Sequence, residues 1–193
     1  MLSHTSGLGG GSYTITYVEE AVKNKFNRID DYKPLSVNYK LDFEPGTKFD
    51  YNNLGYHLLG AIIEKVSGMS YYNYINENLF KPANMVNAGF PVSNSDPYLM
   101  SIGYEKVLEN GRLIIKDNTD RVNIKGSPAG LGYATVKDMF QFSRALKQNI
   151  LITEQTKQLI FSPKEELNAR RYGYGFQIRT IGDKKIVLHT GGI

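Results

Sequence analysis

The sequence predicts an α+β (α/β) fold class, with helices and loops over about residues 1–165 and antiparallel strands over 172–193. Two observations predict it. Apolar residues between 54 and 66 recur at the spacing of one helix face, which indicates an amphipathic helix. The dipeptides Asn110-Gly111 and Gly182-Asp183 each join two strand-like runs, and such dipeptides favour the tight turns of antiparallel hairpins.

Helix signals mark five segments, through a Thr, Ser or Asn cap, a helical apolar period, or a Gly or Pro stop. They cover about residues 17–27, 53–67, 71–79 and 136–148, and a shorter stretch from Thr153. Gly68 is expected to end the second helix, Ser70 to cap the third, and Thr135 with Asp138 to form a capping box for the fourth. The helix at 53–67 is expected to bury Leu54, Leu58, Leu59, Ile62, Ile63 and Val66. The helix at 136–148 is expected to bury Val136, Met139, Phe140, Phe142, Ser143 and Leu146.

Composition excludes several classes of protein. Of the 193 residues, 41% are hydrophobic and 22% charged, which suits a packed core. The net charge is +4 and the basic residues are scattered, so a nucleic-acid partner is not expected. There is no cysteine, and the three histidines are far apart, so neither a metal site nor a cofactor is expected. No apolar run is long enough to form a transmembrane segment.

The tripeptide Tyr51-Asn52-Asn53 at the start of the second helix has two interpretations. In the first, asparagine caps the helix and Tyr51 packs on it. In the second, Tyr51 and Asn53 lie on a bend that faces a cleft. A tyrosine hydroxyl can relay protons if a nearby cation lowers its pKa, and an asparagine amide can donate to a substrate carbonyl.

Four short stretches in a fixed order carry a family resemblance: residues 2–8 (LSHTSGL), 51–53 (YNN), 126–146 (GSPAGLGYATVKDMFQFSRAL) and 189–192 (HTGG). Together with the helical region around 54–85, they resemble the serine β-lactamase-like hydrolase superfamily, which includes class C β-lactamases, penicillin-binding DD-peptidases and related esterases. The resemblance covers nearly the whole chain and implies a partial domain of the β-lactamase/transpeptidase-like fold, with a helical lobe and part of its antiparallel sheet.

The resemblance also implies roles for the site residues. YNN resembles a Tyr-x-Asn element, in which Tyr51 would relay protons and Asn53 would hold the substrate's amide. HTGG resembles a Lys/His-Thr-Gly strand, in which His189, Thr190, Gly191 and Gly192 would orient an acyl substrate and its carboxylate. The motif order predicts that Tyr51 and His189 lie close in space, although 138 positions separate them. The implied partner is a small-molecule or peptide acyl substrate: a β-lactam, a D-Ala peptide or an ester. The implied location of the full-length parent is periplasmic, cell-envelope or secreted.

One departure from the family pattern concerns the nucleophile that the family's chemistry requires. No Ser or Thr in the sequence is followed three residues later by Lys, so the Ser-x-x-Lys nucleophile of the family is missing. We expect an internal fragment, truncated at both ends, that is inactive alone; the alternative is a non-catalytic binding protein that lost the nucleophile. Ser127 is interpreted as a loop residue, His4 as part of a local turn, and His57 as a helix-surface or core-edge residue.

Overall fold

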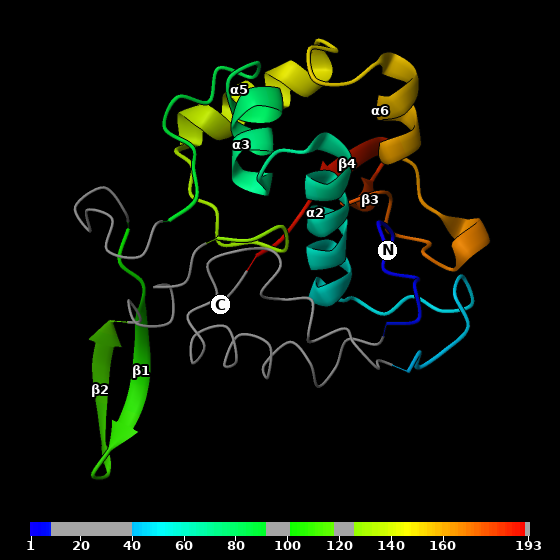
Figure 1. The fold of residues 1–193 in the computed structure, drawn as a ribbon. Helices are drawn as coiled ribbons and strands as arrows, with labels where there is room; N and C mark the ends of the chain where they lie inside the picture. The colour runs from blue at the N-terminus through cyan, green and yellow to red at the C-terminus, as the bar shows by residue number, and fades with distance from the viewer. Residues whose placement is uncertain (9–39, 92–100, 118–125, 192–193) are drawn as a thin grey trace.

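The computed structural model describes residues 1–8, 40–91, 101–117 and 126–191 (Figure 1). The helix expected at 17–27 and Gly192 lie outside these residues. The described elements are three helices of at least seven residues, several shorter helical segments and two separate antiparallel hairpins. The predicted combination of helices with antiparallel strands is therefore confirmed.

Helix α2 (Asn53–Ser67) is the longest described helix and ends at Gly68, which adopts the left-handed conformation at φ 70°. Its range agrees with the prediction, but its buried face differs. The fully buried positions are Leu54, Gly55, His57 and Gly60. Ile62 and Val66 are 48% and 82% exposed. Small residues decide the packing here, because a Cβ on Gly60 would lie 2.1 Å from Cγ of Pro128.

The next helical segment changes type halfway. Helix α3 (Tyr71–Ile75) begins after Ser70, whose side chain accepts from the backbone N–H of Asn73, and it continues as the π-helical turn η2 (Asn76–Phe80). The predicted 71–79 helix is thus present with a wider second turn. The end of this segment packs on an apolar cluster of the described residues. Its buried members are Ala83, Met85 and Ala145, and the partly buried residues around them are Leu79, Phe80, Ala88, Phe142 and Leu151.

Helix α5 (Val136–Lys147) carries the predicted capping box between Thr135 and Asp138. The predicted apolar face is wrong at Val136, Met139 and Phe140, which are 89%, 54% and 62% exposed, whereas Phe142 packs against the apolar cluster as expected. Asp138 and Ala145 are the buried positions instead, because Asp138 also accepts a hydrogen bond from the Asn87 backbone and thereby turns that side of the helix inward.

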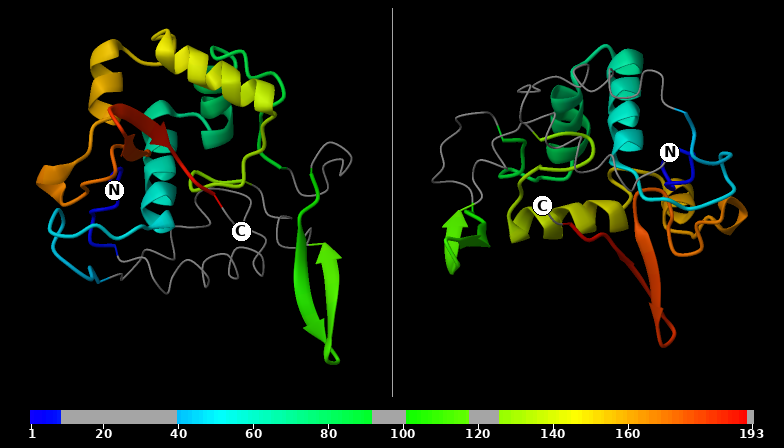
Figure 2. Two further views of the ribbon diagram at one scale, coloured as in Figure 1. Left: turned by 180° about the vertical axis from the view of Figure 1, so that it is seen from behind. Right: turned by 90° about the horizontal axis from the view of Figure 1, so that it is seen from below.

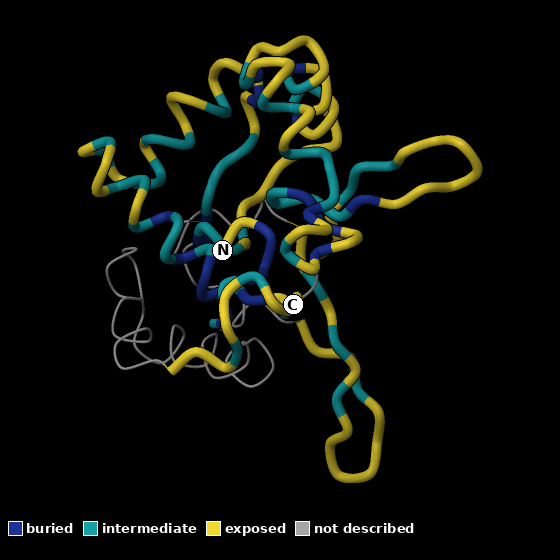
Figure 3. Tube along the Cα trace, turned by 90° about the vertical axis from the view of Figure 1, so that its right-hand side faces the viewer, coloured by how far each residue is buried: buried dark blue, intermediate teal, exposed yellow. Residues whose placement is uncertain are grey.

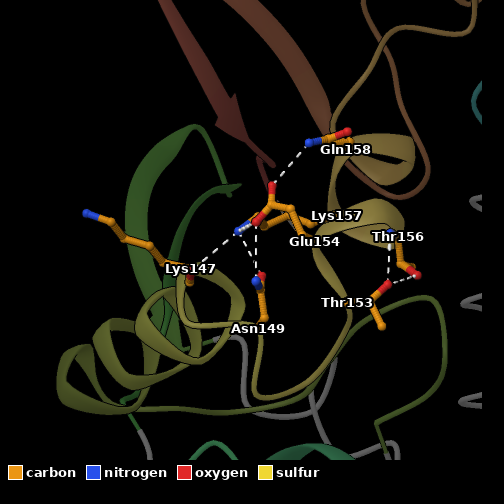
Figure 4. A network of polar contacts seen from close by, with 7 residues as sticks. All are labelled: Lys147, Asn149, Thr153, Glu154, Thr156, Lys157 and Gln158. Atoms are coloured by element: carbon orange, nitrogen blue, oxygen red, sulfur yellow. Dashed lines mark hydrogen bonds and ion pairs between the residues drawn. The ribbon is translucent and has the colours of Figure 1, made fainter.

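Helix α6 (Glu154–Ile160) follows, with Thr153 as its N-cap. A polar network joins it to the end of α5 (Figure 4). Lys157 Nζ lies 2.7 Å from a Glu154 carboxylate oxygen and donates to Oδ1 of Asn149 at 2.9 Å and to the Lys147 carbonyl at 3.3 Å. These contacts tie α6 to the end of α5. A short 3₁₀ turn, η4 (Glu165–Leu167), leads on toward the C-terminal strands.

Both predicted hairpins are confirmed. Strands β1 (Tyr104–Glu109) and β2 (Arg112–Asp117) are joined by Asn110 and Gly111, which have φ of 50° and 74° as a type I′ turn requires. Strands β3 (Gln177–Ile181) and β4 (Lys184–Leu188) are joined at Gly182-Asp183. The β1–β2 hairpin projects away from the helices, and both hairpin tips are exposed (Figures 2 and 3).

The N-terminal segment and the C-terminal hairpin meet near the start of α2. Residues 1–8 run beside α2 (Figure 1), where the Tyr56 hydroxyl donates to the Leu2 carbonyl at 2.9 Å. The backbone N–H of Gly175, just before β3, donates to the same carbonyl at 3.1 Å. Three parts of the chain that are distant in sequence therefore converge on the YNN bend.

Candidate active site

The bend at residues 51–53 is held by its middle residue. Asn52 has an extended backbone, with φ −145° and ψ 118°, and its Oδ1 accepts from the backbone N–H of Gly55 at 2.8 Å. Its Nδ2 donates to the Leu8 carbonyl at 2.5 Å, and the residue is 4% exposed. The capping interpretation of the tripeptide therefore applies to Asn52.

Tyr51 and Asn53 lie on the other side of this bend, because successive side chains alternate along an extended backbone. Tyr51 is 40% exposed and Asn53 is half-buried. Neither side chain makes a hydrogen bond within the part of the chain that the structure describes. The relay interpretation asks for a cation that lowers the pKa of Tyr51; in the described structure burial raises this pKa from its ordinary value of 10.0.

His4 has a larger role than the sequence suggested. Its neighbours do form a local turn, since Ser3 Oγ and Thr5 Oγ1 are 2.9 Å apart. The imidazole of His4, however, is buried and makes long-range contacts: Nδ1 accepts from the backbone N–H of Asn52 at 3.0 Å, and Nε2 lies 3.1 Å from the Tyr172 hydroxyl. The His4 side chain therefore bonds distant parts of the chain, Asn52 and Tyr172, rather than the local turn in which it was expected to take part.

The end of β4 brings the predicted strand residues to the same place. The His189 ring lies 6.1 Å from the Tyr51 ring, so the prediction that these two residues are close is confirmed. Thr190 Oγ1 accepts from Nε2 of Gln177 at 3.2 Å. Gly191 is exposed, and a Cβ built on it would meet no atom of the described residues within 4 Å, so within that part of the chain this side of the strand is open.

Tyr172 is the residue that the sequence did not single out. Its hydroxyl lies between His4 Nε2 and His189 Nε2, at 3.1 Å and 2.8 Å. The residue is 4% exposed, and burial raises the pKa of its phenol. As one of 14 tyrosines it carries no distinguishing signal except its place in the stretch Tyr-Gly-Tyr-Gly-Phe that leads into β3.

Two other candidates are placed in structural roles. Ser127 Oγ accepts from the Ala129 backbone N–H at 3.3 Å and sits 3.5 Å from the Gly130 carbonyl, which ties it to its own turn as expected for a loop residue. His57 is 1% exposed, so its placement on the helix surface is wrong. Burial lowers the pKa of His57 to about 3, which keeps this imidazole neutral.

The described ranges contain no group of three or more His, Asp or Glu side chains arranged to hold a metal ion. The helices within these ranges include none that is both long and apolar enough to cross a bilayer.

Comparison with known proteins gives the family. The family model described as beta-lactamase matches residues 1–193. This chain belongs to the beta-lactamase family. Within that family it is 31% identical to penicillin-binding protein 4* of Bacillus subtilis over 209 residues, and 30% identical to protein flp of Staphylococcus aureus (strain N315) over 196 residues. It covers 45% and 37% of these two relatives, although they cover 100% and 99% of it.

Solved structures of other proteins agree with this fold. The penicillin binding protein from Bacillus halodurans superposes with a TM-score of 0.78 at 30% identity, over 94% of this chain and 57% of that one. The D-stereospecific amidohydrolase from Streptomyces sp. superposes with a TM-score of 0.77 at 22% identity, over 100% and 59%, which supports the fold alone. The beta-lactamase/transpeptidase-like fold implied by the sequence motifs is confirmed. The family is of the serine hydrolase and acyl-transferase type.

Proposed function

We propose that the protein carrying this chain is a serine hydrolase that forms an acyl-enzyme with β-lactams, D-Ala peptides or esters. Tyr51 relays protons to and from the nucleophile and leaving group, and Asn53 donates to the substrate's amide carbonyl. His189, Thr190 and Gly191 form the strand along which the acyl substrate lies, with Gly192 continuing it. The observation that supports this most directly is the 6.1 Å approach of the Tyr51 and His189 rings beside an open strand end.

The chemistry of these groups fits acyl transfer. A phenol with its hydroxyl exposed can pass a proton between a nucleophile and a leaving group in the transition state. An exposed strand end can hold an extended substrate through its main-chain groups. Glycine at position 191 keeps the approach to that strand unobstructed.

The nucleophile is not among these 193 residues, which contain no Ser-x-x-Lys. The proposal therefore requires a serine from the remainder of the full-length protein. Loss of the nucleophile costs about 10⁶-fold in kcat in a serine protease, so the 193-residue chain alone is expected to be inactive. The periplasmic, cell-envelope or secreted location of the parent belongs to the same proposal.

The test is acylation of the full-length protein. Incubation with a fluorescent penicillin, followed by peptide mapping, is expected to label a serine that precedes x-x-Lys and lies outside residues 1–193. A chromogenic ester assay measures turnover in parallel. Labelling of Ser127, or of any serine within the chain, would overturn the assignment of Tyr51 and His189. Ligand binding without acylation or turnover would support the alternative of a non-catalytic binding protein that lost the nucleophile.

A further inference from the structure

A continuous chain of hydrogen bonds crosses the candidate site. It starts at the backbone N–H of Asn52, passes through both nitrogens of His4 and the hydroxyl of Tyr172, and reaches both nitrogens of His189. The successive distances are 3.0 Å, 3.1 Å and 2.8 Å, and the last link, from His189 Nδ1 to the Thr190 carbonyl, is 2.6 Å. The chain therefore connects the YNN bend to the His-Thr-Gly strand.

The two ends of this chain fix the direction of every bond in it. A backbone N–H only donates, so His4 Nδ1 accepts from Asn52 and the proton of the neutral ring is on Nε2. A carbonyl only accepts, so the proton of His189 is on Nδ1 and its Nε2 is an acceptor. The Tyr172 hydroxyl oxygen therefore accepts a hydrogen bond from His4 Nε2–H, and the hydroxyl donates a hydrogen bond to His189 Nε2. Every hydrogen bond in the chain therefore runs in the same direction, and hydrogen bonds in such a chain strengthen one another cooperatively.

The surroundings of His4 hold this arrangement in place. Its ring lies 4.1 Å from the Tyr51 ring and 5.0 Å from the Tyr56 ring, while Phe49 and Tyr172 pack edge-on at 5.9 Å and 4.8 Å. Its carbonyl accepts from the Asp50 backbone N–H at 2.8 Å. Burial is the main cause that lowers the pKa of His4 to about 4, so the ring is neutral near pH 7 and keeps Nδ1 as an acceptor.

We propose that His4 and Tyr172 are positioning residues for the site, which hold His189 in the Nδ1–H tautomer and fix the His-Thr-Gly strand against the YNN bend. In this state both ring nitrogens of His189 are engaged within the protein. His189 therefore acts by holding the strand in place. The assignment of a catalytic consequence rests on the proposed function, whereas the tautomer is a property of the folded protein alone.

The tautomer is measured directly in the full-length protein. Long-range ¹H–¹⁵N correlation spectra of ¹⁵N-histidine-labelled protein distinguish Nδ1–H from Nε2–H, and at about pH 8 an ordinary histidine is neutral. The His189 signal is assigned by its loss in His189→Gln. The expected result is Nδ1–H in the unsubstituted protein. Observation of the Nε2–H tautomer there would overturn the proposal, whether or not any variant folds.

The variant that tests the relay is Tyr172→Phe, which removes one hydroxyl and keeps the ring. It is expected to remove the hydrogen bond to His189 Nε2, which shifts the ¹⁵N resonance of that nitrogen, while the Thr190 carbonyl still holds the proton on Nδ1. Loss of this contact is expected to lower kcat on the chromogenic ester roughly 10- to 100-fold, the scale of a misplaced reacting group. The matched control is Tyr174→Phe, two residues away, whose ring faces Lys164 Nζ at 4.4 Å. This control is expected to change neither the Nε2 resonance nor kcat.

The outcomes separate the two proposals. An unsubstituted protein that neither hydrolyses the ester nor reacts with penicillin contradicts the proposed function, while its His189 spectrum still decides the tautomer. An unchanged ¹⁵N resonance of His189 Nε2 in folded Tyr172→Phe overturns the positioning role. A shifted Nε2 resonance with unchanged kcat overturns its catalytic consequence.

Discussion

The rings of Tyr51 and His189 lie 6.1 Å apart, although 138 positions separate them in the sequence. The His4 ring links them, since its centroid lies 4.1 Å from that of the Tyr51 ring and it hydrogen-bonds the same Tyr172 hydroxyl that contacts His189. A residue near the N-terminus thus joins the two halves of the candidate site. The consequences of this arrangement can be measured through single substitutions.

Tyr51→Phe in the full-length protein is expected to lower kcat by about 10²–10⁴-fold while KM changes little. The phenol works in the transition state, and the phenylalanine ring preserves the contact with His4. Steady-state kinetics on a chromogenic ester measure both constants. Tyr104→Phe is the control, because Tyr104 is 66% exposed on the projecting β1–β2 hairpin. Unchanged turnover in Tyr51→Phe would return Tyr51 to a packing role.

Alanine substitutions at Asn52 and Asn53 are expected to have different effects, the first mainly on the free energy of unfolding and the second mainly on substrate binding. Asn52→Ala removes the N-cap of α2 and its bond to Leu8, so the free energy of unfolding should fall by about 1–2 kcal/mol. Asn53→Ala removes a side chain that makes no hydrogen bond within the described residues, so it should leave stability nearly unchanged and weaken substrate binding. Chemical denaturation and ester kinetics of the two variants give the comparison. Equal losses of stability would contradict the assignment of the cap to Asn52.

Gly60 and Gly55 provide a matched pair within α2. Gly60→Ala places a Cβ 2.1 Å from Pro128 Cγ, so the contact must open, at a cost of about 1–3 kcal/mol. Gly55→Ala meets its nearest atom, in Met1, only at 3.7 Å, and alanine's helix propensity should leave stability equal or higher by up to about 1 kcal/mol. Thermal or chemical unfolding measures both. Tolerance of alanine at position 60 would contradict the described packing of α2 on the 126–131 loop.

Stability is expected to fall as the pH drops below about 6.5. Burial lowers the pKa of His57 to about 3 and of His4 to about 4 in the folded chain, from an ordinary 6.5. The unfolded chain therefore binds more protons below pH 6.5, and the free energy of unfolding decreases from there toward the folded-state values. Urea unfolding between about pH 7.5 and 5 tests this.

The control for this pH dependence is His57→Gln, which removes one titrating group and should make the dependence shallower. The chosen range lies above the ordinary pKa values of Asp138 and Glu154, 3.8 and 4.5, whose pKa values are lowered in the fold by hydrogen bonds from Thr135 and Lys157. A free energy of unfolding that stays constant between pH 7.5 and 5 would contradict the burial of these histidines.

The sequence by itself determined the elements whose signals are local. The cap residues Ser70, Thr135 and Thr153, the stop at Gly68 and the two hairpin turns all act within a few residues of themselves, and each lies where it was predicted. The motif order also indicated the family and the meeting of Tyr51 with His189. The roles of Tyr51, Asn53 and the strand residues in catalysis remain predictions.

Only the tertiary structure decided which faces are buried and which residue joins the site. Leu and Ile positions in α2 follow a helical period, yet Gly60 turns inward because Pro128 packs against it, a contact 68 positions away that no local pattern encodes. Tyr172 looks like any other tyrosine until folding places its hydroxyl between two histidines. Local propensity depends on neighbours in sequence, whereas burial and a hydrogen-bond chain depend on neighbours in space, and these are set by the packing of segments that begin far apart.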